Sequence, residues 1–524
     1  MKYRINESSN IYDIKTVISE HYEMEVNELD ELNTVELSNP KTVTNIEKCL
    51  DILRDIKRKN QKILIVGDYD CDGICATTIL ATAFEKCKLN YGFYIPNRLT
   101  EGYGLNVDIL KKAIEKGYQN VITVDNGVKA FEAMKFAKEN QLRLIITDHH
   151  TFDIEDIDCD CFIHPFLNDD MFYNCSGAGI ALQIARCMIP SDKDIVCYAA
   201  LAAIADCMPV TRENRNIIRK GIDYLNEGCA APLHALKNKP QDKFDIKMMS
   251  YTIIPKINSM GRLCDVVNVN NAVRYLMLKD VNAILNTASQ INKINDLRKE
   301  KTSEMEKMAL LENKSFEILT SPEYHEGIVG LLASKLSNTY KKPFIVLTEN
   351  KENYNGSIRG VEGFHLIDYF KDFDGFEKFG GHAQAAGVTL QKDKLVELKE
   401  YIDTHPVEIQ ESNQIMECEQ INEQALNVED VKDYTNLAPF GIGFEEINFY
   451  IENINIQNKV SLANGKYYKV ISNHDIEYLF FKSDLFDRIQ ENMNVVGKLG
   501  ISEFRGNIKV NMIVDAILED EDYV

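Results

Sequence analysis

Short apolar runs alternate with longer amphipathic segments through the first half of the chain. Five runs predict buried strands, at 62–66, 91–95, 121–124, 144–147 and 161–163. The segments between them, such as 75–86 and 107–116, have the spacing of helices. Strands that alternate with helices predict an α/β fold with a parallel sheet. Ligands of such sheets bind beyond the carboxyl ends of the strands, so those ends are where we look for chemistry.

The pattern changes downstream. Residues 199–205 and 212–225 read as helical, and 270–313 contains neither Gly nor Pro, which predicts a long connecting helix or a helix pair. A second, smaller α/β pattern follows, and the last strands, with an Asn464-Gly465 turn, predict an OB-like β-barrel. We therefore expect an N-terminal helical lead-in, a parallel-sheet domain, a connecting helix, a smaller α/β domain and a barrel, at 1–60, 61–269, 270–313, 314–402 and 403–524.

The composition indicates which ligands and which cellular compartment suit the chain. The 524 residues carry a net charge of −22, which weighs modestly against nucleic-acid binding, because phosphates are bound by Lys and Arg. The 13 cysteines form no C-x2-C pairs and indicate reduced thiols. No run approaches the roughly 20 apolar residues that span a bilayer. We expect a soluble cytoplasmic protein, a monomer with no membrane contact.

Acidic and imidazole side chains follow three of the predicted strands. The candidates are Asp68, Asp70 and Asp72 after the first strand, Asp125 after the third, Asp148, His149 and His150 after the fourth, and Asp206 at the end of the helical run 199–205. Carboxylates and imidazole suit Mg²⁺ or Mn²⁺, and two such ions can hydrolyse a phosphoester.

Each acid alone could be a helix N-cap, but coincidence at three strand ends favours a shared metal site. A phosphate-binding G-x-x-x-x-G-K-[ST] loop and a G-x-S-x-G esterase motif are both missing from the sequence. The residues therefore favour metal-dependent hydrolysis over the chemistry of an NTPase or a serine esterase.

The same segments resemble a known family. Val66 to Gly73, Thr123 to Gly127, Thr147 to His150 and Ala202 to Asp206 resemble the four motifs of the DHH phosphoesterases, and Gly380-Gly381-His382-Ala383 resembles the GGHA motif of the DHHA1 domain. Further segments resemble the RecJ branch of single-strand-specific 5′-to-3′ exonucleases. They are Ile95 to Arg98 with Glu101 to Leu105, Glu213 to Arg215, Ile257 to Leu263, and Leu437 to Gly443.

This resemblance, over roughly residues 60–524, implies Mn²⁺- or Mg²⁺-dependent release of 5′-mononucleotides from single-stranded DNA. It implies one ion at Asp70 and Asp125, and a second at Asp72, Asp125, His149 and Asp206. Asp68 would support the cluster or join it, Asp148 would orient the histidine pair, and His150 would contact the scissile phosphate or assist proton transfer. Phosphate contacts are expected from Arg98, Arg262, Arg359 and His382. A helicase and a single-strand binding protein are the partners such an enzyme would have.

The sequence departs from the family at His164-Pro165, where Asn-Pro is frequent, and we interpret His164 as a tolerated change rather than an added contact. Tyr324 and Phe504 stand at positions that are often Trp in the family. Aromatic residues of the predicted barrel could stack on bases or fill its core: Tyr467, Tyr468, Phe480, Phe481 and Phe504.

Two other functions are compatible with the motifs. One is a DHH-family phosphodiesterase that acts on short oligonucleotides or cyclic dinucleotides, which would need only the two α/β domains. The other is a non-catalytic scaffold of the same fold, which would be expected to lose metal ligands. The C-terminal 120 residues disfavour the first, and the complete set of acids and histidines disfavours the second.

Overall fold

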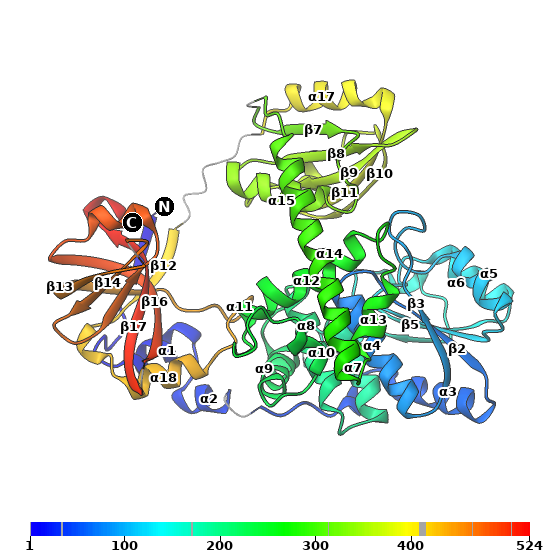
Figure 1. Ribbon diagram of the computed structural model, residues 1–524, viewed down its shortest axis with the longest axis horizontal. Coiled ribbons are helices and arrows are strands. Elements are labelled where there is room, and N and C mark those ends of the chain that lie inside the picture. The colour runs from blue at the N-terminus through cyan, green and yellow to red at the C-terminus, as the bar shows by residue number, and fades with distance from the viewer. Residues whose placement is uncertain are drawn as a thin grey trace. The chain divides into compact units, whose positions relative to one another are not determined.

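The structure is a computed structural model that describes residues 2–32, 35–168, 171–312, 314–407, 415–463, 465–504 and 506–524. The chain divides into two compact units (Figure 1). The larger unit is Leu37–Ser412, and the smaller one combines Met1–Glu36 with Asn413–Val524. No helix among the described residues has both the length and the apolar character needed to cross a membrane.

A five-stranded parallel sheet forms the centre of the larger unit, with strand order β3-β2-β4-β5-β6. Its strands confirm the five predicted runs to within one residue: β2 (Lys62–Val66), β3 (Asn90–Tyr94), β4 (Asn120–Val124), β5 (Arg143–Thr147) and β6 (Cys161–Ile163). The chain enters the sheet at β2, next to its middle, and then moves outward in both directions. The carboxyl ends of β2, β4 and β5 are therefore neighbours.

Helices cover both faces of this sheet (Figure 1). Ile63 and Ile65 point into a core with helices α3 (Ile46–Arg58), α4 (Cys71–Lys86), α7 (Gly177–Met188) and α8 (Lys193–Ala205). Leu64 and Val66 point into the opposite core, with α5 (Val107–Glu115) and α6 (Phe131–Glu139). Successive strand residues face opposite sides, so the continuous apolar runs seen in the sequence follow from burial on both faces.

A helical layer continues the unit after α8. It comprises α9 (Arg212–Asn226), α10 (Ala231–Ala235), α11 (Ile246–Met248), a π-helical turn at Met249–Ile253, α12 (Ile254–Arg262), α13 (Asn270–Leu276) and α14 (Val281–Lys307). The predicted connecting segment is thus a helix pair, α13 and α14. Ile284, Ala288 and Ile291 of α14 pack into the core of the parallel-sheet domain, so the first half of this connector is anchored there.

A second sheet, of order β10-β11-β9-β8-β7, confirms the smaller α/β domain. Its elements are β7 (Glu317–Ser321), α15 (Val329–Tyr340), β8 (Phe344–Glu349), β9 (Asn353–Arg359), α16 (Leu366–Tyr369), β10 (Phe376–His382), β11 (Ala385–Gln391) and α17 (Leu395–Thr404). The segment before α15 packs closely on α12, because a methyl group on Gly327 would lie 1.9 Å from the Arg262 carbonyl oxygen.

The smaller unit contains a closed five-stranded barrel, as predicted. The strands are β13 (Phe449–Leu462), β14 (Tyr467–Ser472), β15 (Glu477–Phe480), β16 (Asn492–Phe504) and β17 (Asn507–Leu518). β13 pairs with β14 on one side and with β16 on the other, which closes the barrel. Asn464, half of the predicted turn, lies outside the described residues.

The first 36 residues differ from the expected helical lead-in. β1 (Lys2–Asn6) pairs in parallel with β12 (Ile415–Gln420), and α1 (Ile14–Tyr22) and α2 (Val26–Glu31) follow. Ile14 and Val17 are fully buried with the barrel core and with α18 (Val428–Asn436). The pairing partner of this strand lies over 400 residues away, so the short polar–apolar alternation of 2–6 gave little local signal.

Candidate metal centre

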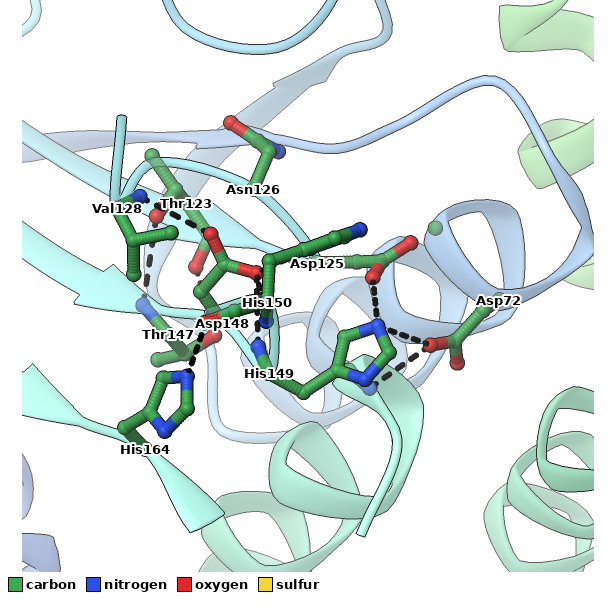
Figure 2. Close-up of polar contacts among 12 residues, drawn as sticks. Asp72, Thr123, Asp125, Asn126, Val128, Thr147, Asp148, His149, His150 and His164 are labelled. Carbon is green, nitrogen blue, oxygen red and sulfur yellow. Dashed lines mark hydrogen bonds and ion pairs between the residues drawn. The ribbon is translucent and has the colours of Figure 1, made fainter. Parts of the chain in front are cut away.

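The acids and histidines predicted from the strand ends meet at one edge of the parallel sheet, and Figure 2 shows Asp72, Asp125, Asp148, His149 and His150 among them. Three overlapping groups place one possible ligand atom from each member within 4.8 Å of the others. The groups are Asp68, Asp70 and Asp125; Asp72, His149 and Asp206; and Asp125, His149 and His150. Asp125 belongs to two of the three groups, so it lies between the predicted ligand sets.

Asp125 has an unusual backbone. It directly follows β4 with a φ of 61°, the left-handed region that few residues other than glycine occupy. Helix α7 approaches so closely that a methyl group on Gly177 would lie 2.5 Å from the Asp125 Cβ. The carboxylate is buried, and its Oδ1 accepts no hydrogen bond from the described residues, although Nε2 of His149 lies 3.1 Å away. Local strain and an unsatisfied buried oxygen together indicate a functional position.

His149 connects the acids that come from different elements. Its Nε2 lies 3.1 Å from Oδ1 of Asp125, 3.5 Å from Oδ2 of Asp206 and 3.8 Å from Oδ2 of Asp72. Figure 2 shows the ring between Asp125 and Asp72. Burial holds the pKa of His149 below its ordinary value despite these carboxylates. A neutral imidazole surrounded by carboxylate oxygens is a suitable ligand for a divalent cation.

Asp148 orients the histidine pair through its own hydrogen bonds. Its Oδ1 accepts bonds from the His149 backbone N–H at 2.7 Å and from Nδ1 of His150 at 2.7 Å, and its Oδ2 accepts one from the Val128 N–H at 3.0 Å. Burial opposes ionisation of Asp148, but these bonds outweigh it and lower its pKa. Burial also acts against protonation of His150, yet the bond to Asp148 raises its pKa to about 9.

The loop from Asp68 to Asp72 joins β2 to α4. Asp70 caps the helix, since its Oδ1 accepts a bond from the Gly73 N–H at 3.1 Å. Asp72 accepts bonds from the Gly177 and Ala178 N–H groups at the start of α7, both at 2.8 Å. Asp70 is therefore a helix N-cap, as the alternative interpretation of the sequence held. It is at the same time a member of the acidic cluster.

The charges of this cluster are poorly compensated within the protein. Burial, followed by repulsion from neighbouring carboxylates, raises the pKa values of Asp68, Asp70 and Asp125, and raises that of Asp206 to about 8. Oδ1 of Asp68, like Oδ1 of Asp125, lacks a hydrogen-bond partner among the described residues. Oxygen-rich ligands with unsatisfied buried atoms fit Mn²⁺ or Mg²⁺, whose charge would compensate the repulsion.

The predicted phosphate contacts lie partly beside this cluster. The Arg98 guanidinium lies over the Tyr69 ring, 4.9 Å from its centre. The charge of Arg262 acts on the pKa of Tyr69, and burial lowers the pKa of Arg262 itself to about 10. Arg359 is the last residue of β9 and donates hydrogen bonds to Oγ of Ser334 at 3.0 Å and to Oγ of Ser357. Burial, followed by the charge of Arg98, lowers the pKa of Arg359. The His382 side chain lies outside the described part of the structure.

Three residues contribute to the geometry that sequence reasoning did not assign. The Tyr103 hydroxyl donates to the Asp125 carbonyl oxygen at 3.0 Å and lies 3.4 Å from the His150 ring nitrogens. The Asn126 amide donates to the carbonyl oxygens of Val66 and Val124, and so joins the ends of two strands. The glycines on both sides of Tyr103 were the available signal, since both have positive φ.

His164 is the third, and its interpretation as merely a tolerated change is wrong. It is fully buried, its Nδ1 accepts a bond from the Phe166 N–H at 3.1 Å, and its Nε2 lies 2.9 Å from the His150 carbonyl oxygen. Burial lowers its pKa to about 4. A neutral ring with hydrogen on Nε2 satisfies both contacts and fixes the backbone that carries His150.

Comparisons with known proteins show which domains the chain contains. Models of the DHH family N-terminal domain, the DHHA1 domain and the RecJ OB domain match residues 62–208, 313–405 and 419–516. The chain is 26% identical over 528 residues to the single-stranded-DNA-specific exonuclease RecJ of Haemophilus influenzae, covering 91% of each. It is 28% identical to that of Bacillus subtilis over 514 residues, covering 92% of this chain and 64% of that protein.

A solved structure supports the fold independently. The crystal structure of RecJ in complex with Mn²⁺ from Thermus thermophilus matches with a TM-score of 0.80 at 19% identity, covering 99% of this chain and 79% of that one. The Mg²⁺ complex of the same protein matches with a TM-score of 0.74 at 18% identity, covering 99% and 78%. With its DHH, DHHA1 and RecJ OB domains in this order, the chain belongs to the RecJ family of the DHH/DHHA1 phosphoesterase superfamily.

Proposed function

We propose that this protein is a single-stranded-DNA-specific 5′-to-3′ exonuclease of DNA repair and recombination that releases 5′-mononucleotides with two Mn²⁺ or Mg²⁺ ions. The convergence of carboxylates from three strand ends, with unsatisfied oxygens on Asp68 and Asp125, carries the proposal. The relatives described as single-stranded-DNA-specific exonucleases supply the substrate class.

Two ligand sets are proposed for the ions. Asp70 and Asp125, supported by Asp68, would hold one, and Asp72, His149 and Asp206 would hold the other with Asp125 shared. Divalent cations supply Lewis acidity, which polarises phosphoryl oxygens and eases the ionisation of water. The chain's contribution is a set of ligands whose positions the sheet fixes in advance.

Proton transfer and phosphate binding are proposed for the residues around the ligands. His150, charged and oriented by Asp148, would give a proton to the 3′ oxygen of the departing nucleotide. Arg98, Arg262, Arg359 and His382 would hold phosphates. Through its hydroxyl group, Tyr103 would fix the position of the His150 ring relative to the backbone of Asp125.

The barrel is proposed to bind the single strand. Tyr467 and Phe481 are 39% and 49% exposed and lie edge to face, so bases could stack on them. Phe480 is fully buried and belongs to the barrel core instead. The Phe504 side chain lies outside the described part of the structure. We propose that the roles divide among domains at 61–269, 270–313, 314–402 and 403–524, with the first residues joined to the barrel.

The compartment, the oligomeric state and the partners of the protein are proposed as well. The 13 cysteines, all of them described, are unpaired, which suits a reducing compartment such as the cytoplasm. We propose a monomer that acts on single strands together with a helicase and a single-strand binding protein, and without a membrane partner.

The test is digestion of single-stranded DNA labelled at either end, with Mn²⁺ or Mg²⁺. We expect labelled mononucleotide to appear at once from the 5′ label and only late from the 3′ label, with little digestion of a blunt duplex. A series of strand lengths serves as a control. Preference for dinucleotides over long strands would contradict the proposal and favour a short-oligonucleotide phosphodiesterase.

A further inference from the structure

A cationic pocket lies where α12, α14 and α15 meet. Its volume is about 350 Å³, and four cations line it, Lys256 and Arg262 from α12 and Arg298 and Lys299 from α14. No Asp or Glu is among the described residues that line it. In a chain of net charge −22, a pocket lined by four cations and by no acidic residue among those described calls for an explanation.

Three of the four cations have no carboxylate within ion-pair distance among the described residues. Nζ of Lys256 donates to the Leu236 carbonyl at 2.6 Å and to Asn238 at 2.9 Å, and Arg298 donates to Asn295 at 2.6 Å. Only Lys299 has an acidic partner, Asp296 at 3.3 Å. Burial followed by the charges of Arg98 and Arg298 lowers the pKa of Arg262, and burial followed by the charge of Lys299 lowers that of Lys256. Like charges held together in partly buried positions favour an anionic ligand.

The pocket shares a wall with the metal centre. The Asn258 side chain, which lines the pocket, accepts a bond from the Cys71 N–H at 2.7 Å, at the metal-site loop. A methyl group on Gly261 would lie 2.1 Å from the Tyr69 carbonyl oxygen. The charges of Arg298 and Asp70 both act on the Arg262 guanidinium. An anion in the pocket would therefore lie next to a phosphate at the metal centre.

An aromatic ring stands at the pocket as well. Tyr251 is 82% exposed and belongs to the π-helical turn Met249–Ile253, a feature that occurs often at functional sites. An exposed ring beside cations is the combination that binds a nucleotide, with the base stacked and the phosphate paired.

We propose that this cationic pocket is a subsite for one nucleotide of the single strand, adjacent to the scissile phosphate, with Arg298, Lys299 and Lys256 at the phosphate and Tyr251 against the base. The proposal rests on the proposed exonuclease function. It assigns to α12 and α14 a role in holding the strand in addition to joining the two α/β domains. The alternative source of the same chemistry is a free nucleotide.

The test uses the double variant Arg298→Ala/Lys299→Ala in the full chain, with Lys293→Ala as its control. Lys293 is exposed on the same helix and does not line the pocket. For long single strands we expect KM to rise about tenfold or more, because charge-assisted hydrogen bonds are lost, with kcat within about twofold. Tyr251→Ala should raise KM for long strands in the same direction. The salt dependence of binding should weaken by a slope of about 0.7 for each lost phosphate contact.

A neutral methylphosphonate placed at one linkage at a time locates the contact. In the wild type, one linkage near the cleavage point should raise KM when it is neutral, and the double variant should be insensitive at that linkage alone. If the double variant keeps the wild-type KM, or loses affinity equally at every linkage, the subsite is refuted. Loss of inhibition by free mononucleotide with an unchanged strand KM would also refute it. A wild type that digests no single strand contradicts the proposed function instead.

Discussion

The carboxylate cluster and the cationic pocket gather charge of opposite sign, and neither is neutralised by the protein itself. The cluster places Asp68, Asp70 and Asp125 together with unsatisfied oxygens, and the pocket holds Lys256, Arg262 and Arg298 without an acidic partner among the described residues. The first is built at the ends of strands, and the second on the faces of two helices. The two regions therefore favour ligands of opposite charge, for which we propose a divalent cation and a phosphate.

Elsewhere this chain compensates buried charge well. Glu317 in β7 is almost fully buried, yet it pairs with Lys342 at 2.7 Å and accepts bonds from the Glu312 and Lys314 N–H groups. These contacts outweigh the burial that raises its pKa, so the pKa lies below the ordinary value. Burial in this structure therefore does not by itself leave a charge uncompensated, and departures from local consistency are expected at functional sites.

Among the residues around the metal ligands, the largest effect is expected for His150, the proposed proton donor. His150→Ala should lower kcat by about 10²- to 10⁴-fold, the usual contribution of general acid–base catalysis. Single-turnover digestion of a 5′-labelled strand in Mn²⁺ measures it. His474→Ala, which removes an exposed ring from the barrel unit, serves as the control and should retain full activity. A loss below tenfold for His150→Ala would show that the proton comes from elsewhere.

The stabilisation by Mn²⁺ in thermal unfolding should depend on the carboxylate cluster and not on the cationic pocket. Mn²⁺ at about 100 times its Kd should stabilise the fold by about 2.7 kcal/mol, since it relieves carboxylate repulsion and binds only the folded chain. Arg298→Ala should keep this increase in melting temperature, because Arg298 lines the other region. Asp125→Ala should lose most of it. An equal shift in Asp125→Ala would place the ion outside the cluster.

The smallest effect is expected for Tyr103→Phe, which removes only a hydroxyl group. One hydrogen bond contributes about 1 kcal/mol, so kcat should fall about fivefold while KM for the strand stays the same. Steady-state rates in Mn²⁺ measure the split. A rise in KM with unchanged kcat would mean that the ring contacts the strand and does not position Asp125 and His150.

The sequence predicted the fold class and the meeting of the acids and histidines at one sheet edge, because both depend on local signals. Five apolar runs defined the parallel sheet, and the order of strands in such a sheet brings Asp68, Asp125 and Asp148 to one edge. The sequence did not predict three features: the contact of His164 with His150, the pairing of β1 with β12, and the cationic pocket. Each joins segments distant in sequence, and nothing in the local pattern at Arg298 or Tyr251 distinguishes a pocket wall from an ordinary helix surface.

The central claim is that the carboxylate cluster holds the ions that hydrolyse the strand, and Asp125→Ala tests it most directly. Asp156→Ala, an exposed acid outside the cluster, is the matched control. Removing one charge from a self-repelling cluster should leave the unliganded fold intact, which circular dichroism and melting without metal would show. Mn²⁺-dependent release of nucleotides should be abolished in Asp125→Ala and unchanged in Asp156→Ala. Retained Mn²⁺-dependent activity in a folded Asp125→Ala protein would contradict the shared two-ion site.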